Sequence, residues 1–107
     1  MDKEYYKRQI ENIKTKIGRI KEYIADERTK IAKIKEKITH RKEYYRQRIR
    51  DSKTKSQKDN YRTNRDREIN SLKRDIERHK KRIENYKDDI DRKRKEIKQI
   101  RERMKRN

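Results

Sequence analysis

Residues 10–24 read IENIKTKIGRIKEYI, with an isoleucine at every third or fourth position. This spacing places the isoleucines on one stripe of an α-helix, at the a and d positions of a heptad repeat lettered a to g. Ile10, Ile17 and Ile24 occupy a positions, and Ile13 and Ile20 occupy d positions. The same phase resumes at Ile31, Ile34 and Ile38. The stretch therefore predicts a long amphipathic helix whose narrow apolar seam packs against another helix.

A second run with the same spacing occupies residues 69–104 and predicts a second long helix. Its stripe positions are Ile69, Leu72, Ile76, His79, Ile83, Tyr86, Ile90, Lys93, Ile97, Ile100 and Met104. The two runs are out of phase. Continuing the register of the first run would put Ile69 at d and Leu72 at g, whereas the spacing of the second run makes them a and d. One uninterrupted coiled coil would need a stutter or stammer between them.

The segment between the runs predicts a turn. Residues 51–64 read DSKTKSQKDNYRTN, and Ser, Thr, Asn and Asp side chains compete with the helical backbone and favour caps and turns. Thr63 with Asp66 resembles a capping box that would start the second helix.

These features predict an all-α fold, in which residues 1–107 form a single antiparallel two-helix coiled-coil hairpin. We expect a first helix over about 2–51, a turn over about 52–63 and a second helix over about 64–106. Two registers fit the stripe equally well, with Ile20 facing either Ile90 or Ile97.

The composition predicts that the hairpin self-associates. Only 25% of the residues are apolar and 55% are charged, so little apolar surface is available to offset chain entropy. Isoleucine at both a and d favours assemblies of more than two helices. We therefore expect hairpins to pair into a four-helix bundle as homo-oligomers, or to be ordered by a polyanion.

Several classes of protein are disfavoured by what the sequence lacks. There is no cysteine, so disulfides and thiolate metal sites are excluded and nothing indicates an oxidising compartment. No apolar run is long enough for a membrane span or a signal-peptide core. The expected location is inside the cell, in cytoplasm or nucleoid, or inside a virus particle, without secretion and without a membrane partner.

The sequence also predicts that the protein is not an enzyme and holds no cofactor. It has no cysteine nucleophile and no glycine-rich loop for phosphate. His40 and His79 are its only histidines, and two ligands without a neighbouring cluster make a poor metal site. The polar stripe positions Glu27, Arg41 and Lys93, with His79, are expected to reach out to solvent and to specify helix pairing.

Positive charge is the strongest functional signal. The formal net charge is +19, and the excess is spread over both helices and the turn. Such a distribution suits contact with a phosphate backbone along the protein's length. We therefore expect a structural protein that coats, compacts or packages DNA or RNA with little sequence specificity, as nucleocapsid or chromatin proteins do.

Two dense clusters of cations and two tyrosines are the candidate nucleic-acid-binding residues. Tyrosine rings among cations could stack on bases or contact sugars. Each Tyr-Tyr pair is expected to place one ring in the core, as Tyr6 and Tyr45, and the other outward. The candidates near the turn are Tyr44, Arg46, Arg48, Arg50, Lys53, Lys55, Lys58, Tyr61, Arg62 and Arg65. Those near the carboxyl end are Arg92, Arg94, Lys95, Lys98, Arg101 and Lys105.

In architecture alone, such a hairpin is similar to the helical nucleocapsid proteins of filamentous archaeal viruses, in which paired helices wrap DNA. The likeness implies DNA coating, and no sequence motif carries it. Two alternatives remain open. One is a small coiled-coil adaptor or inhibitor that docks on an acidic protein surface of a larger machine. The other is a ribonucleoprotein component that is ordered only on RNA.

Overall fold

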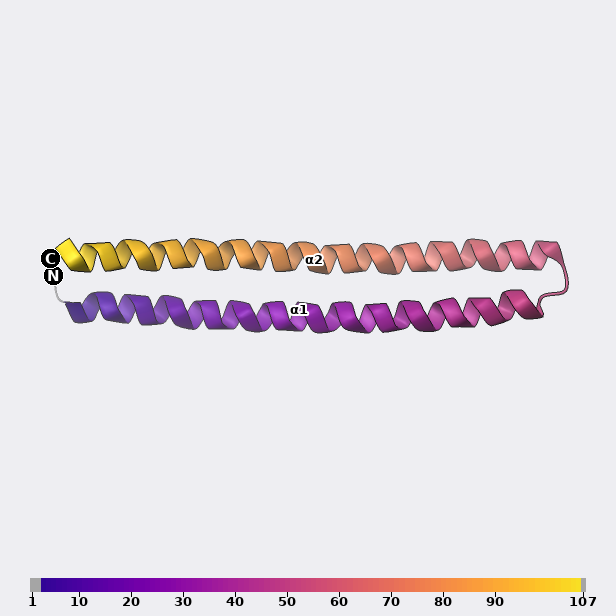
Figure 1. The fold of residues 1–107 in the computed structure, drawn as a ribbon, viewed down its shortest axis with the longest axis horizontal. Coiled ribbons are helices and arrows are strands. Elements are labelled where there is room, and N and C mark those ends of the chain that lie inside the picture. The colour runs from indigo at the N-terminus through magenta and orange to yellow at the C-terminus, as the bar shows by residue number, and fades with distance from the viewer. Residues whose placement is uncertain (1–2, 107) are drawn as a thin grey trace. The chain divides into compact units, whose positions relative to one another are not determined.

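The computed structural model describes residues 3–106, which form two long helices and no strand. Helix α1 runs from Lys3 to Asp51 and helix α2 from Lys55 to Arg106. The two helices lie side by side in opposite directions and are joined by a short turn (Figure 1). The predicted all-α helical hairpin is therefore confirmed.

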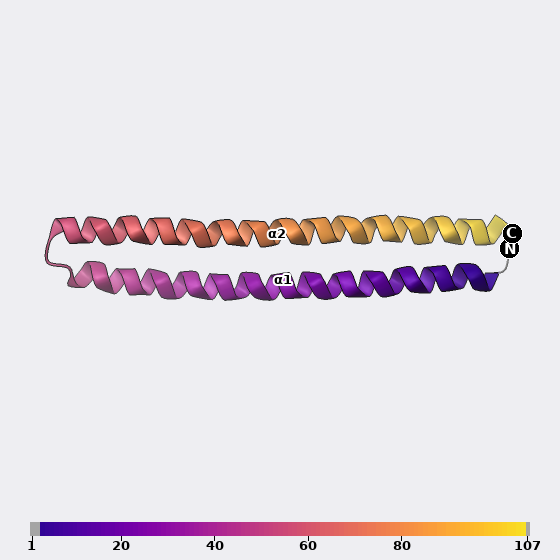
Figure 2. The ribbon, with the colours of Figure 1, turned by 180° about the vertical axis from the view of Figure 1, so that it is seen from behind.

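Contacts divide the helices into two compact units. Unit 1 joins residues 1–27 to residues 81–107, and unit 2 comprises residues 28–80 with the turn. In each unit, a segment of α1 lies beside an antiparallel segment of α2, and both views show this pairing (Figures 1 and 2). Each unit thus holds a two-helix seam of its own.

The predicted stripe is the core of both units. Its isoleucines are buried, except for the half-buried Ile34. Tyr6 and Tyr45 are buried whereas Tyr5 and Tyr44 are exposed, so each Tyr-Tyr pair divides its rings as expected. The remaining buried apolar residues are Ile10, Ile13, Ile17, Ile20, Ile24, Ile31, Ile38, Ile69, Leu72, Ile76, Ile83, Ile90, Ile97 and Ile100.

The predicted turn over residues 52–63 was too long. Helix α1 ends at Asp51 as expected, but α2 begins at Lys55, so residues 55–63 are helical. Their Ser, Asn and Asp side chains do not break the helix because tertiary contact overrides local propensity. Within this segment, Lys58 and Tyr61 are half-buried.

The cap that starts α2 also differs from the predicted pair of Thr63 and Asp66. Thr54 Oγ1 accepts a hydrogen bond from the Gln57 backbone N–H at 3.1 Å. The Gln57 side-chain oxygen in turn accepts one from the Lys53 N–H at 3.3 Å. This is a variant of the capping box, in which threonine is followed three residues later by glutamine. It allows the chain to reverse over residues 52–54 without glycine or proline.

Cross-helix contacts distinguish the two possible registers. The rings of Tyr23 and Tyr86 lie 5.7 Å apart between centroids, and Arg41 is paired with Glu68. Both pairs fit the alignment in which Ile20 faces Ile90. A shift by one heptad, with Ile20 facing Ile97, would separate both pairs by about 10 Å along the helix axis.

Neither α1 nor α2 contains a stretch that is long and apolar enough to cross a bilayer.

Candidate nucleic-acid interface

The e positions of both helices carry a repeated cation. In α1, every e position from residue 7 to residue 42 is lysine or arginine, and in α2 so is every one from 73 to 101. All these side chains are exposed. We call this set the cationic face. It consists of Lys7, Lys14, Lys21, Arg28, Lys35 and Lys42 on α1, and Lys73, Lys80, Lys87, Arg94 and Arg101 on α2.

In unit 1, the cationic face encloses a groove of about 390 Å³ between the two helices. Lys14 and Lys21 line it from α1, and Arg94 and Arg101 from α2. The buried Ile17 and Ile97 also contact the groove, and none of the described residues that line it is acidic. Four cations therefore converge on one shallow, partly apolar channel.

A larger groove of about 600 Å³ lies near the turn in unit 2. Its lining carries one acidic residue, Asp66, whose Oδ1 lies 3.0 Å from Arg65 Nε. Positive charge therefore exceeds negative charge by four in this groove. The lining residues are Lys42, Arg46, Ile49, Arg62, Arg65, Asp66, Ile69, Asn70 and Lys73.

The two grooves occupy equivalent heptad positions, four heptads apart in the sequence. Lys14 and Gly18 in unit 1 correspond to Lys42 and Arg46 in unit 2, and Ile97 corresponds to Ile69. In unit 1, Gly18 leaves the groove open, because no atom lies within 4 Å of where its Cβ would be. The heptad pattern therefore builds the same kind of cationic channel twice.

Within residues 3–106, none of the described ion pairs neutralises the cationic face across the seam. Four of its cations contact an acid, and each acid lies three residues earlier on the same helix, at 3.5–4.0 Å. These side chains are all more than half exposed, and such pairs contribute little to stability. Among residues 3–106, the described ion pairs of this face therefore stay within one helix. The two rows of cations face each other across the seam.

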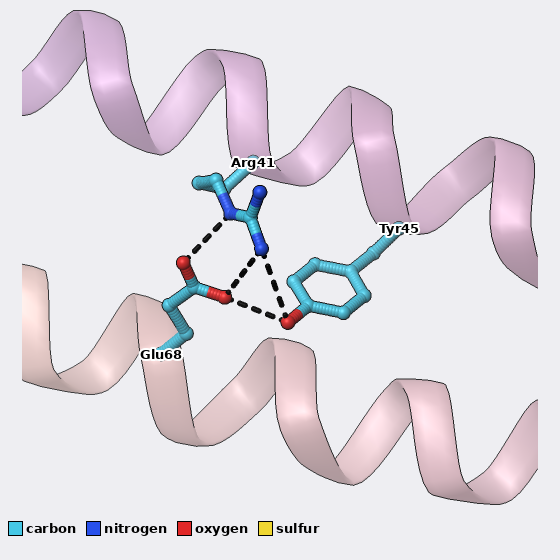
Figure 3. Close-up of polar contacts among 3 residues, drawn as sticks. All are labelled: Arg41, Tyr45 and Glu68. Carbon is cyan, nitrogen blue, oxygen red and sulfur yellow. Dashed lines mark hydrogen bonds and ion pairs between the residues drawn. The ribbon is translucent and has the colours of Figure 1, made fainter.

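The opposite side of the seam has complementary charge. In α2 its g positions include Glu68, Asp75, Asp89 and Glu96. In unit 2, Arg41 of α1 contacts Glu68, with Nε 2.7 Å from Oε1 and Nη2 donating a 3.0 Å hydrogen bond to Oε2 (Figure 3). The Tyr45 hydroxyl donates a second hydrogen bond to Oε2 at 2.6 Å. In unit 2, the Glu68 cluster therefore ties the two helices together by polar contacts.

The contacts in this cluster shift the pKa of all three groups. Hydrogen bonds from Arg41 and then Tyr45 lower the pKa of Glu68. The hydrogen bond to Glu68 is the main cause that raises the pKa of Tyr45, and it also raises the pKa of Arg41. Each shift favours the charge state that holds the cluster together.

The structure brings together only some of the residues predicted to bind nucleic acid. Arg46, Arg62 and Arg65 line the unit 2 groove, and Arg94 and Arg101 line the unit 1 groove. The remaining cations of the prediction are not among the residues that line these two grooves. They are Arg48, Arg50, Lys53, Lys55, Lys58, Arg92, Lys95, Lys98 and Lys105.

The two candidate stacking tyrosines lie away from the cationic face. Tyr44 stands at a g position and is 38% exposed. The guanidinium carbons of Arg41 and Arg48 lie 4.5 and 5.2 Å from its ring centroid, and Tyr45 packs edge-on against it at 5.1 Å. Tyr61 is half-buried. Both rings already have partners or cover within the hairpin.

The sequence prediction missed the lysines of the two grooves, namely Lys14, Lys21, Lys42 and Lys73. A signal for them was present in the sequence, because they recur at the e positions that flank the predicted seam. The local density of cations is instead highest near the turn and in the carboxyl-terminal segment. Heptad position, and not local density, determines which cations meet across the seam.

Within residues 3–106, no three histidine, cysteine or carboxylate side chains come together in a way that could hold a metal ion. Comparison of the chain with protein-family models, curated proteins and solved structures found no match.

Proposed function

We propose that this protein is a non-enzymatic structural protein that binds DNA or RNA through phosphate contacts with little sequence specificity. The observation that carries the proposal is the cationic face, whose lysine and arginine side chains line two grooves with an excess of positive charge. The biological role would be to coat, compact or package nucleic acid.

Physical reasoning favours a polyanion as the ligand. Lysine and arginine that neutralise phosphates release condensed counterions, and this release drives binding without reading sequence. A net charge of +19 also exceeds what solubility requires of a small domain. The grooves offer cations that can bind phosphates. They do not offer an arrangement typical of base readout, such as a single recognition helix that enters the major groove and contacts base edges.

Self-association into a four-helix bundle is part of the proposal. Three large aromatic side chains remain exposed, Tyr5, Tyr23 and Tyr44, and all three stand at c or g positions, away from the cationic face. A second hairpin that packs there would bury these rings and leave both cationic faces free. Sedimentation analysis over a range of concentrations tests this part, and a monomer at all concentrations would contradict it.

The first test of the function is co-purification. The untagged protein is purified at low salt, and the ratio of absorbance at 260 and 280 nm is recorded before and after a salt wash. The proposal expects nucleic acid that is shed as salt rises, and sequencing it identifies the polymer. Protein that is free of nucleic acid and fails to shift DNA or RNA in a gel would contradict the proposal.

A competition experiment distinguishes the proposed function from the main alternative, in which the protein is an adaptor or inhibitor on an acidic protein surface. Polyglutamate and duplex DNA are compared as competitors at equal concentration of charge. A nucleic-acid-binding protein releases labelled DNA more readily to unlabelled DNA than to polyglutamate. Preference for polyglutamate, together with a discrete protein complex, would favour the alternative.

A further inference from the structure

We infer that the cationic face binds the phosphate backbone of a nucleic-acid duplex, DNA or RNA, in preference to a single strand. This inference rests on the proposed function and adds which surface binds and which form of the polymer it takes. It is carried by the arrangement of charge in the two units and by the positions of the tyrosines.

The two rows of the cationic face are electrostatically unfavourable when nothing lies between them. Coiled coils commonly place opposite charges at e and g positions, where they form pairs between helices. Here Lys14 and Lys21 face Arg94 and Arg101 across the unit 1 groove without an acidic residue in its lining. Like charges that face each other disfavour the folded state. An external polyanion in the groove would convert this repulsion into attraction.

The spacing of the cations suits a linear polymer of regular charge. Residues at successive e positions are separated by about 10.5 Å along a helix, from a rise of about 1.5 Å per residue. With two rows, each unit offers a cation about every 5 Å along the seam. Duplex nucleic acid carries a charge about every 1.7 Å of its axis, so each unit always finds phosphates opposite its cations, whatever the register.

The cationic face lacks the side chains that single-strand binding uses. Proteins that bind single strands stack successive bases on aromatic rings. Among the described residues that line the unit 1 groove and the unit 2 groove, none is aromatic. All tyrosines stand at core, c or g positions. These tyrosines are Tyr5, Tyr6, Tyr23, Tyr44, Tyr45, Tyr61 and Tyr86. Without stacking, affinity depends on charge density, which is higher in a duplex than in a single strand.

The test compares two variants of equal net charge. The face variant changes Lys14, Lys21, Arg94 and Arg101 to glutamine. The control variant changes four exposed cations of unit 1 at c, f and g positions to glutamine, two on each helix. These are Lys16, Arg19, Lys81 and Arg103. Both variants lose two lysines and two arginines, and circular dichroism verifies that both remain helical.

Affinity is measured by fluorescence anisotropy, at several salt concentrations, for random-sequence duplex DNA, duplex RNA and a single strand of equal length. The wild-type protein is expected to prefer both duplexes to the single strand. The face variant should lose at least about tenfold in duplex affinity. The negative slope of log K against log salt should become shallower by up to about 3.6, since each lost phosphate contact removes about 0.9 from its magnitude. The control variant should lose no more than about threefold.

A second readout does not involve nucleic acid. The face variant removes like charges that face each other, so its melting temperature at low salt should be higher than that of the wild type. The increase should be larger than the increase for the control variant. A lower melting temperature for the face variant would contradict the inferred repulsion across the groove.

The outcomes separate this inference from the proposed function. Equal losses of affinity in the two variants would overturn the assignment to the cationic face, while nucleic-acid binding itself would stand. Tighter binding of the single strand would overturn the duplex preference. Failure of the wild-type protein to bind any of the three polymers would overturn the proposed function as well. A preference for only one duplex supports the inference and shows which polymer the face takes.

Discussion

Arg41 of α1 contacts Glu68 of α2 through both carboxylate oxygens, with Nε 2.7 Å from Oε1 and Nη2 3.0 Å from Oε2. The Nε contact is an ion pair without the alignment of a hydrogen bond, although Nε itself is buried. Tyr45 completes the cluster by donating its hydroxyl to the same carboxylate. A charged pair at the rim of the seam thereby links the two helices of unit 2 at a fixed register.

Replacing Tyr45 by phenylalanine tests the hydroxyl in this cluster. The Tyr45→Phe change keeps the buried ring and removes the 2.6 Å hydrogen bond to Glu68. We expect the free energy of unfolding to fall by about 1 kcal/mol, because a hydrogen bond to a charged group is lost while its acceptor keeps Arg41. Urea titration followed by circular dichroism measures the change.

The matched control is Tyr44→Phe, which removes the hydroxyl of the adjacent exposed ring. It should leave the free energy of unfolding within a few tenths of a kcal/mol of the wild type. Equal destabilisation by the two changes would mean that the hydroxyl of Tyr45 has no special role in pairing the helices.

The same cluster predicts how stability depends on pH. The pKa of Glu68 is lowered from its ordinary value of 4.5. Its contribution is therefore fully present above pH 4.5, and it is lost as pH falls through the lower pKa of the folded state. The pKa of Tyr45 is raised from 10.0, so its contribution is present below pH 10 and is lost as pH rises through the raised value.

Glu68→Gln isolates the acidic part of this dependence. The variant should melt at a lower temperature than the wild type at pH 7. The gap should close as pH falls from 4.5 through the lowered pKa of the folded state, because the wild-type carboxylate becomes protonated over that range. Glu36→Gln, at an exposed position of α1 in the same unit, serves as the control. A gap that stays constant from pH 7 to pH 3 would show that the ionised carboxylate does not stabilise the fold.

Much of the fold follows from the isoleucine seam. Positions such as Ile17 and Ile90 are buried as predicted, because a period of 3.5 residues over many heptads leaves one stripe to pack. The register did not follow, since an isoleucine ladder looks the same after a shift of seven residues. Particular polar and aromatic pairs, such as Arg41 with Glu68, distinguish the alignments, and these are visible only once both helices are placed.

The turn and the interface were harder to predict for different reasons. The segment around Asp59 and Asn60 has weak helix propensity, but the Thr54 cap starts the helix ahead of it, and Tyr61 within it is half-buried. Local counts of charge could not show which cations meet, because the seam joins residues as distant in sequence as Lys14 and Arg101. The cationic face follows from heptad position instead, because its cations recur at the e positions of both helices.

Glu27 offers a test of the polar positions within the seam of unit 1. It occupies a d position and is only 6% exposed, and Arg82 Nη1 lies 3.8 Å from its Oε1. Taking a carboxylate out of water is costly, and replacing a buried ion pair by apolar residues is often neutral or stabilising, whereas removing one partner destabilises only where the other charge stays buried. We expect Glu27→Leu to raise the free energy of unfolding by about 1 kcal/mol, because the side chain of Arg82 is 57% exposed and stays hydrated.

The control for this change is Glu22→Leu, at an exposed position of the same helix. It removes the same charge and adds the same side chain without filling the seam, so stability should change little. Thermal melts of both variants decide the point. A lower melting temperature for Glu27→Leu than for the wild type would mean that the contacts of Glu27 outweigh its desolvation.

Gly18 is the only glycine of the chain, and it stands in the interior of α1 without a positive φ angle. A Cβ built there meets no atom within 4 Å, so alanine fits without strain. Because glycine in a helix interior is less favourable than alanine by about 0.5–1 kcal/mol, Gly18→Ala should raise the free energy of unfolding by about that amount in a urea titration. Ala25→Gly and Ala32→Gly, at the equivalent exposed heptad positions, should lower it by a similar amount. If Gly18→Ala destabilises the hairpin instead, then the surface of the unit 1 groove is covered in solution, as it would be if another copy of the chain packed there.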